Sequence, residues 1–123
     1  MISMYFYLDK SHDAEELAVD LLKRGLVAHA SIDLNNNSMT IEKGKIKKQV
    51  CSLITAQTKA LLFNKVSEYL TNKYRNHIKI YSAPIAQCNE VFSELIRKNT
   101  IKLSENILRQ FILEVIRCVE GNN

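Results

Sequence analysis

The segment LLKRGLVAHASI (residues 21–32) constrains the fold more than any other, because it holds the end of a helix and the start of a strand. Gly25 can take the left-handed backbone conformation that ends a helix. Residues 26–33 then run as mostly small and apolar residues, which predicts an extended segment. Ser11 is a suitable N-cap for the preceding helix. The apolar side chains on one face of that helix are Ala14, Leu17, Ala18, Leu21 and Leu22. These features predict an amphipathic helix that leads directly into a strand.

The rest of the chain alternates between strand-like and helix-like segments. Besides residues 26–33, the segments typical of strands are 4–8, 38–42, 45–55 and 78–85. The sequence LNNNS (34–38) is typical of a polar turn, and Gly44 of the centre of a tight hairpin. Further helices are predicted from Gln57 or Thr58 to about Asn72, after Asn89 and after Ser104. Their expected core-facing residues are Leu62, Val66, Tyr69 and Leu70 in the second helix and Val91, Phe92, Leu95 and Ile96 in the third.

The order strand, helix, strand, strand, helix, strand predicts the fold class. It is the β-α-β-β-α-β arrangement of an α+β, ferredoxin-like sandwich, here with extra C-terminal helices. We expect residues 1–100 to form this domain and residues 101–123 to form a helical extension packed on the same domain. This fold hosts many unrelated activities, so it decides no function by itself.

An apolar stripe in the last helix supports a packed extension. Its members are Leu108, Phe111, Ile112, Val115, Ile116 and Val119. A stripe of this size is too apolar to leave in water, so we expect it to pack on the chain's own sheet or on a neighbouring subunit. The alternative is a docking helix for a partner protein.

Composition excludes several classes of protein. The 123 residues carry 17 Lys and Arg against 13 Asp and Glu, a net charge of +4, which falls short of a dedicated nucleic-acid footprint. Residues 45–55 also lack the aromatic side chains on which a ferredoxin-like domain would stack RNA bases. No apolar stretch approaches the roughly 20 residues needed to cross a bilayer. We therefore expect neither nucleic acid nor membrane as a partner.

Cysteine usage and the N-terminus indicate the compartment. Cys51, Cys88 and Cys118 are odd in number and far apart, which argues against a disulfide framework and against a paired zinc motif. Free thiols are typical of a reducing compartment. The opening MISMYFYLDK lacks the basic start of a signal peptide. We expect a cytoplasmic protein.

Several segments together resemble one known family. They are AEELAVDLLKRGLVAHASI (14–32), Ser38, the Gly44–Lys45 pair in the hairpin and LITAQT (53–58). In this order and at these intervals they resemble the divalent-cation tolerance (CutA) family over residues 2–98. The chain departs from the family pattern at three places. Residues 40–42 replace a Tyr-x-Trp, residues 73–80 keep only Ile80 of a signature, and His29 stands where the family has cysteine.

The resemblance implies an assembly and a ligand. Members of the CutA family form compact trimers whose sheets meet edge to edge, so the resemblance implies a homotrimer. The ligand that it implies is a divalent metal, copper or zinc. His29 is the candidate metal ligand, while Ser38 and Lys45 are the candidate residues of a ligand pocket. The chain offers no nucleophile beside a plausible base, so we expect no enzyme.

His29 has two readings. As a metal ligand it would supply an imidazole nitrogen, but zinc or copper needs three or four converging donors, so we expect weak binding at best. As a structural residue it would bond to the backbone of a neighbouring strand, and this reading is favoured. The small flanking residues Ala28, Ala30 and Ser31 indicate close approach by another surface, for which a neighbouring subunit is the simplest candidate.

The resulting function hypothesis is a homotrimeric CutA-like binding or regulatory protein that serves divalent metal tolerance. The alternative is a PII-like signalling or structural trimer that binds a small anion or a partner protein without metal. The lysines of KGKIKK (43–48) could hold an anionic ligand, although a solvated hairpin that discourages aggregation is favoured.

Overall fold

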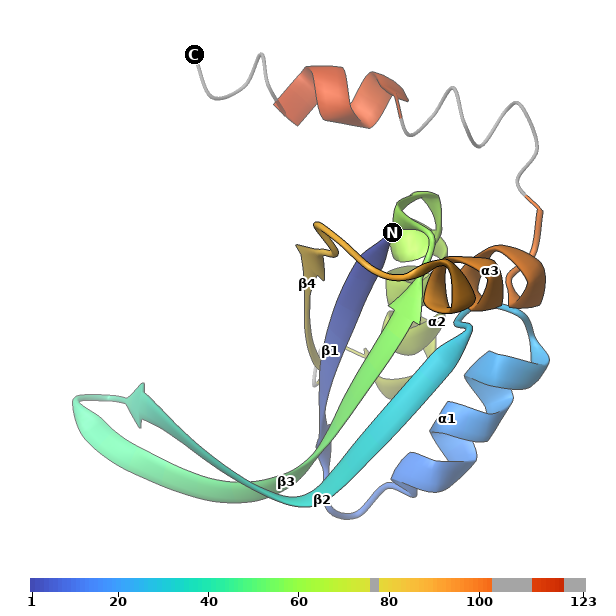
Figure 1. The fold of residues 1–123 in the computed structure, drawn as a ribbon. Coiled ribbons are helices and arrows are strands. Elements are labelled where there is room, and N and C mark those ends of the chain that lie inside the picture. The colour runs from blue at the N-terminus through green and yellow to red at the C-terminus, as the bar shows by residue number, and fades with distance from the viewer. Residues whose placement is uncertain (76–77, 103–111, 119–123) are drawn as a thin grey trace.

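The computed structural model describes residues 1–75, 78–102 and 112–118, and it confirms the α+β, ferredoxin-like fold (Figure 1). The elements run in the order β1 (Ile2–Asp9), α1 (Ala14–Lys23), β2 (His29–Glu42), β3 (Lys45–Thr58), η1 (Ala60–Leu62), α2 (Phe63–Tyr74), β4 (Lys79–Pro84) and α3 (Glu90–Asn99). Residues 112–118 form a further helix. Among the residues described, no helix has the length and apolar character that crossing a membrane requires.

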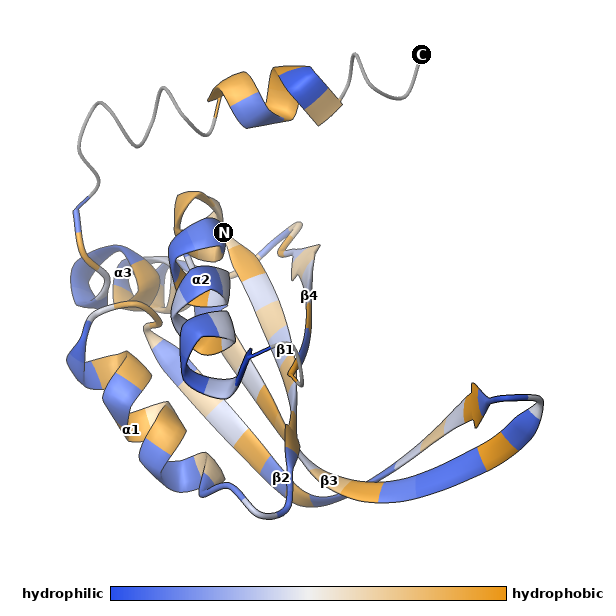
Figure 2. Ribbon diagram, turned by 180° about the vertical axis from the view of Figure 1, so that it is seen from behind, coloured by the Kyte–Doolittle hydropathy of each residue, from blue (hydrophilic) through white to orange (hydrophobic). Residues whose placement is uncertain are grey.

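The four strands form one sheet in the order β2-β3-β1-β4, and every neighbouring pair is antiparallel. Helices α1 and α2 cover one face of this sheet (Figures 1 and 2). Because β4 lies at an edge, Pro84 at its end removes no hydrogen bond that a central strand would need.

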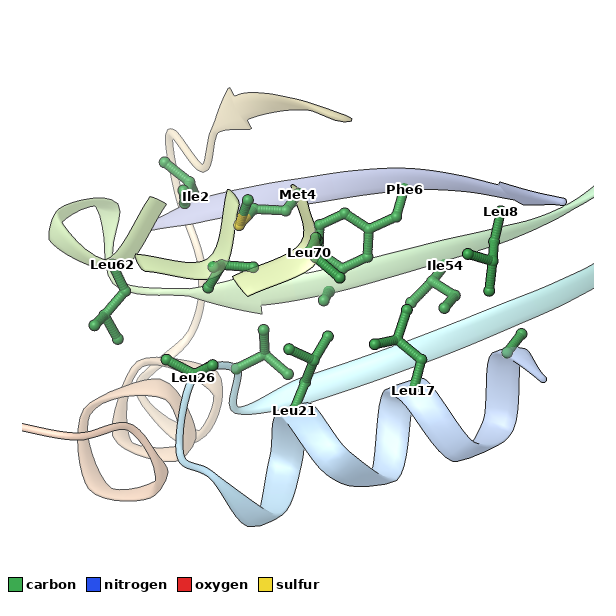
Figure 3. Packing of buried hydrophobic residues seen from close by; sticks show 14 residues of the cluster. Ile2, Met4, Phe6, Leu8, Leu17, Leu21, Leu26, Ile54, Leu62 and Leu70 are labelled. Atoms are coloured by element: carbon green, nitrogen blue, oxygen red, sulfur yellow. The ribbon is translucent and has the colours of Figure 1, made fainter. Parts of the chain in front are cut away.

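The core lies between the sheet and these two helices (Figure 3). Alternate residues of β1 point into it, because successive side chains of a strand point to opposite faces. The buried cluster consists of Ile2, Met4, Phe6, Leu8, Ala14, Leu17, Leu21, Leu26, Val27, Ile54, Ala56, Leu62, Val66 and Leu70. On the opposite face of the sheet, Tyr81 of β4 stacks on Tyr5 with a centroid distance of 4.5 Å.

Helix α1 ends where the sequence predicted, but its N-cap is a different residue. The N-cap is Asp13, whose Oδ1 accepts a hydrogen bond from the Glu16 backbone N–H at 3.1 Å, and Ser11 lies outside the helix. Gly25 has φ +68°, as a left-handed helix end requires. A Cβ on Gly25 would also lie 3.0 Å from Ile101 Cγ2, so glycine allows residue 101 to pack closely there. Leu22, predicted to be buried, is 40% exposed.

The largest correction concerns β2. The predicted turn at residues 34–38 lies inside one continuous strand that pairs with β3 up to Glu42. The register shifts between Asp33 and Asn36, so that Leu34 and Asn35 together face one residue of β3. This β-bulge absorbs the asparagine-rich segment without breaking the strand pairing. The turn prediction was wrong because the local preference of asparagine yields to the pairing along β3.

The starts of α2 and α3 show how tertiary contacts adjust local signals. Thr58 does not open α2: it is the last residue of β3, buried, and its hydroxyl donates to the Leu26 carbonyl at 2.7 Å. Asn89 caps α3 as predicted, because its Oδ1 accepts from the Phe92 N–H at 3.0 Å. Val91 was predicted to face the core but is exposed, whereas Ile96 is buried.

The helix at residues 112–118 approaches the first turn of α2. The side-chain amide of Asn64 donates a hydrogen bond to the Glu114 carboxylate. Ile112, Val115 and Ile116 of the predicted apolar stripe are about half exposed. The other stripe residues, Leu108, Phe111 and Val119, lie outside the described residues, as does the predicted helix start after Ser104.

Candidate functional site

A cavity of about 1060 Å³ lies around the carboxyl end of β1. We call it the end groove. It is lined by Tyr7, Leu8, Asp9, Ser11, His12, Asn36, Asn37, Ser38, Met39, Thr40, Glu42, Lys47, Gln49, Cys51, Lys73, Tyr74, Arg75 and Lys79. These residues come from the hairpin of β2 and β3, from β1 and its following turn, and from the junction of α2 with β4.

The sheet order explains why these segments meet. Strand β1 lies between β3 and β4, and it pairs with β4 up to Tyr7 and with β3 up to Asp9. Tyr7 is paired with Lys79 of β4, and Asp9 is paired with Cys51 of β3. The end groove therefore has one wall from the hairpin and another from the α2–β4 junction, with the end of β1 between them.

The α2–β4 wall is cationic. The end groove contains the cations Lys47, Lys73, Arg75 and Lys79 and the carboxylates Asp9 and Glu42, so two positive charges remain. Glu42 lies 3.4 Å from Lys47, and Lys73 lies 3.9 Å from Asp20. None of the ion pairs between described residues includes Arg75 or Lys79. The excess positive charge therefore concentrates at these two side chains.

The backbone of Arg75 is strained. It follows the last residue of α2 with φ +62° and ψ −145°, a region that glycine occupies readily and other residues rarely do. Such a conformation costs about 1–3 kcal/mol and is often found at functional sites. A cationic side chain is thus held at a position where glycine would be easier to accommodate.

The hairpin wall has no net charge, because Glu42 and Lys47 form an ion pair, and several of its other polar side chains form hydrogen bonds. The Ser38 hydroxyl donates to Asn36 Oδ1 at 3.0 Å and lies 3.4 Å from the buried Cys51 Sγ. Gln49 Nε2 donates to Asp9 Oδ2 at 3.4 Å. Hydrogen bonds from Ser11, its backbone N–H first, hold the pKa of Asp9 below the usual value, with a smaller contribution from nearby His12. Asp9 is therefore ionised at neutral pH.

The three residues predicted from sequence do not form one site. Ser38 lines the end groove, but Lys45 begins β3 beside the hairpin turn and does not. His29 begins β2, nine positions from Ser38, which corresponds to about 30 Å along an extended strand. The sequence analysis missed Lys73, Arg75 and Lys79. The cationic run KYRNHIK (73–79) between a helix and a strand was the available signal.

His29 is part of a hydrogen-bonded row across the sheet. Its Nδ1 lies 2.8 Å from Oε1 of Gln57, its partner on β3, and Gln57 Nε2 donates to Ser3 Oγ at 3.0 Å. The ring also lies 5.8 Å from that of Phe92 in α3. The neighbour is thus a side-chain amide, not the backbone group that the sequence analysis favoured.

The small residues beside His29 have an explanation within the chain. Ala28 is buried, and its N–H donates to the Gln57 carbonyl at 2.8 Å. Ala30 packs against the core cluster. The chain's own core makes the close approach to these two residues, so no neighbouring subunit is needed to explain them.

The side chains of the described residues do not form a divalent-metal centre within one chain. Within residues 1–75, 78–102 and 112–118, no three His, Cys, Asp or Glu side chains gather closely enough to hold a metal ion. A structural or catalytic zinc site needs at least three protein donors. His29 supplies one, and its Nδ1 is already engaged by an amide.

Comparison with known proteins decides the family. The family model described as CutA1 divalent ion tolerance protein matches residues 2–99. The chain belongs to this family. Residues 100–123, with the last helix, lie outside the matched part. None of the curated proteins compared with this chain matches it.

Solved CutA structures have the same fold. CutA1 from Oryza sativa is 19% identical with a TM-score of 0.76, over 83% of this chain and 94% of its own. The divalent cation tolerance protein from Thermus thermophilus is 23% identical with a TM-score of 0.72, over 82% of this chain and 100% of its own. The PII-like protein CutA from Nostoc is 12% identical with a TM-score of 0.73, over 82% and 98%.

Proposed function

We propose that this CutA1-family protein is a homotrimer that acts as a binding or regulatory module in divalent ion tolerance and not as an enzyme. The observation that carries this proposal is the projecting part of the β2–β3 hairpin, residues 36–50, which we call the hairpin arm. It extends away from the rest of the domain (Figure 1) and shows hydrophobic bands among its polar residues (Figure 2).

The apolar residues of the hairpin arm share one face. Ile41 is paired with Ile46. Met39 is the next residue on this face of β2, and Val50 lies on the same face of β3, beyond Lys48. Ile41 is 72% exposed and Ile46 is 63% exposed in the single chain. An exposed apolar surface of this kind marks an interface, so a neighbouring copy is expected to cover it.

The open edges of the sheet also favour a closed assembly. Strand β2 is an edge strand of 14 residues, and long exposed edges promote pairing with other chains. A closed ring of three chains satisfies these edges, whereas an open arrangement would lead to fibres.

A mass measurement tests the assembly. Light scattering at micromolar concentration and moderate salt is expected to give the mass of three 14.1 kDa chains, about 42 kDa. The mass of a single chain would reject the proposal, and the same mass at a tenfold higher protein concentration would exclude dissociation by dilution as the reason.

Metal binding is expected to be weak. Because His29 is a single donor engaged with Gln57, titration calorimetry with Cu²⁺ or Zn²⁺ should give no tight, stoichiometric binding. His29→Ala should leave the weak signal almost unchanged. Tight binding of one metal per chain that disappears in His29→Ala would show that neighbouring subunits complete a site around this residue.

The end groove favours a second candidate function. Its two excess positive charges match a PII-like signalling trimer that binds a small anion or an acidic partner without metal. Metal content of a purified, tag-free sample separates the two candidates. Stoichiometric copper or zinc favours the metal function, and its absence together with anion binding favours the second.

The proposed compartment is the cytoplasm. Cys51, Cys88 and Cys118 are all free thiols, and Cys88 and Cys118 are exposed. Exposed free thiols persist in a reducing compartment and are oxidised elsewhere.

A further inference from the structure

We propose, on the basis of the anion-binding candidate above, that the end groove binds a small phosphorylated compound rich in hydroxyl groups, such as a sugar phosphate. The two walls of the groove differ in chemistry, and each fits one part of such a molecule. The proposal names Arg75 and Lys79 as the phosphate side and Asn36, Ser38 and Gln49 as the hydroxyl side.

The phosphate side follows from the position of free positive charge. Arg75 and Lys79 face the groove from the end of α2 and the start of β4, and neither belongs to an ion pair between described residues. A guanidinium can bind two phosphate oxygens at once, and an ammonium adds a mobile point charge. The Lys73 ammonium lies 3.9 Å from the Asp20 carboxylate, which offsets only part of its attraction for an anion in the groove.

The strained backbone of Arg75 points to the same role. Its φ of +62° places a non-glycine residue where glycine is preferred, at the junction that forms the groove wall. The backbone conformation alone favours glycine at this position. Ligand binding by the guanidinium would explain why the chain has an arginine there.

The hydroxyl side follows from the hairpin wall. Amide and hydroxyl side chains both donate and accept hydrogen bonds, as sugar hydroxyl groups do. Asn36 and Ser38 are already ordered by their mutual hydrogen bond at 3.0 Å, and Gln49 is held by Asp9 at 3.4 Å. Side chains that are fixed in advance lose less entropy when a ligand binds.

The volume of the groove favours an occupant larger than a bare anion. At about 1060 Å³ it lies just above the usual range for small-molecule sites, about 300–1,000 Å³. Inorganic phosphate would contact the cationic wall alone and would leave the hairpin wall to water. In the proposed complex, the sugar phosphate contacts both walls.

Titration calorimetry on the full chain tests the proposal with three probes: glucose 6-phosphate, inorganic phosphate and glucose. Glucose 6-phosphate is expected to bind at least tenfold more tightly than inorganic phosphate, and glucose is expected not to bind at all. Equal affinity for glucose 6-phosphate and inorganic phosphate would overturn the hydroxyl side. If neither glucose 6-phosphate nor inorganic phosphate gives binding heat at millimolar concentration, the whole proposal is overturned.

Charge variants assign the walls. Arg75→Gln combined with Lys79→Gln is expected to weaken glucose 6-phosphate binding at least tenfold, because charge-assisted hydrogen bonds are lost. The matched control is Lys45→Gln, which removes a charge beside the hairpin turn, outside the groove, and should change little. Equal loss in Lys45→Gln would indicate nonspecific attraction and overturn the site.

Gln49→Ala provides a second test, since it removes a hydrogen-bonding side chain of the hairpin wall and leaves Arg75 and Lys79 in place. It is expected to weaken glucose 6-phosphate binding severalfold while the affinity for inorganic phosphate stays the same. An unchanged affinity for glucose 6-phosphate would overturn the hydroxyl side.

Circular dichroism and light scattering on the same samples confirm folding and mass. A monomer that still binds glucose 6-phosphate would reject the trimer alone, and a trimer that binds neither phosphorylated probe would reject the groove proposal alone.

Discussion

Replacing Leu21 with alanine is expected to lower the free energy of unfolding by about 2–5 kcal/mol, because a large buried side chain is lost and a cavity remains. Leu21 has no exposed surface and belongs to the cluster between α1 and the sheet (Figure 3). Urea unfolding, followed by circular dichroism at one fixed protein concentration, measures the change. The concentration must be fixed because assembly contributes to apparent stability.

The next residue provides a matched control. Leu22→Ala removes the same atoms from the same helix, but Leu22 is 40% exposed and is not part of the core cluster. We expect a loss below about 1 kcal/mol, since a large part of this residue is already in contact with water and alanine favours the helix slightly. Equal losses for the two variants would mean that α1 packs in another orientation, or that a neighbouring subunit covers Leu22.

Introducing aspartate on the apolar face of the hairpin arm is expected to convert the trimer to single chains. The variant combines Ile41→Asp with Ile46→Asp, which are paired across the two strands. If a neighbouring copy covers this face, two carboxylates would be buried without partners, and each would cost several kcal/mol. Light scattering should then give about 14 kDa in place of about 42 kDa.

The control for this variant is a charge on the other face of the same arm. Thr40 is adjacent to Ile41, so its side chain points to the opposite face of β2. Thr40→Asp is expected to leave the mass unchanged. If Thr40→Asp dissociates the assembly while the isoleucine variant does not, the opposite face of the arm is the interface. If neither variant changes the trimer mass, the arm makes no essential contact.

The unfolding measurements test the fold of one chain, and the mass measurements test the proposed assembly. Leu21 and Leu22 report on the fold of one chain, and the fold is established by the family match and by the CutA structures. The hairpin arm reports on assembly, which remains a proposal. A stable but monomeric protein would agree with the fold and would reject the trimer.

The sequence by itself determined the features that depend on short-range chemistry. The aromatic segment at residues 4–8 predicted a strand, because aromatic residues favour strands, and this segment lies within β1. Gly25 and Asn89 ended and capped their helices as expected, since left-handed backbone and N-capping are properties of single residues. These elements in order were sufficient for the ferredoxin-like fold.

The tertiary structure decided what depends on distant neighbours. The pairing of β2 with β3 drew an asparagine-rich segment into a bulged strand and so produced the projecting arm. The orientation of α1 left Leu22 exposed, because a helix has one core-facing direction and the pattern of leucines fits more than one. The sheet order brought Lys79 beside Tyr7 and so placed a cation of β4 at the end of β1. No local pattern encodes these distances, since they arise when segments far apart in the chain share one sheet and one core.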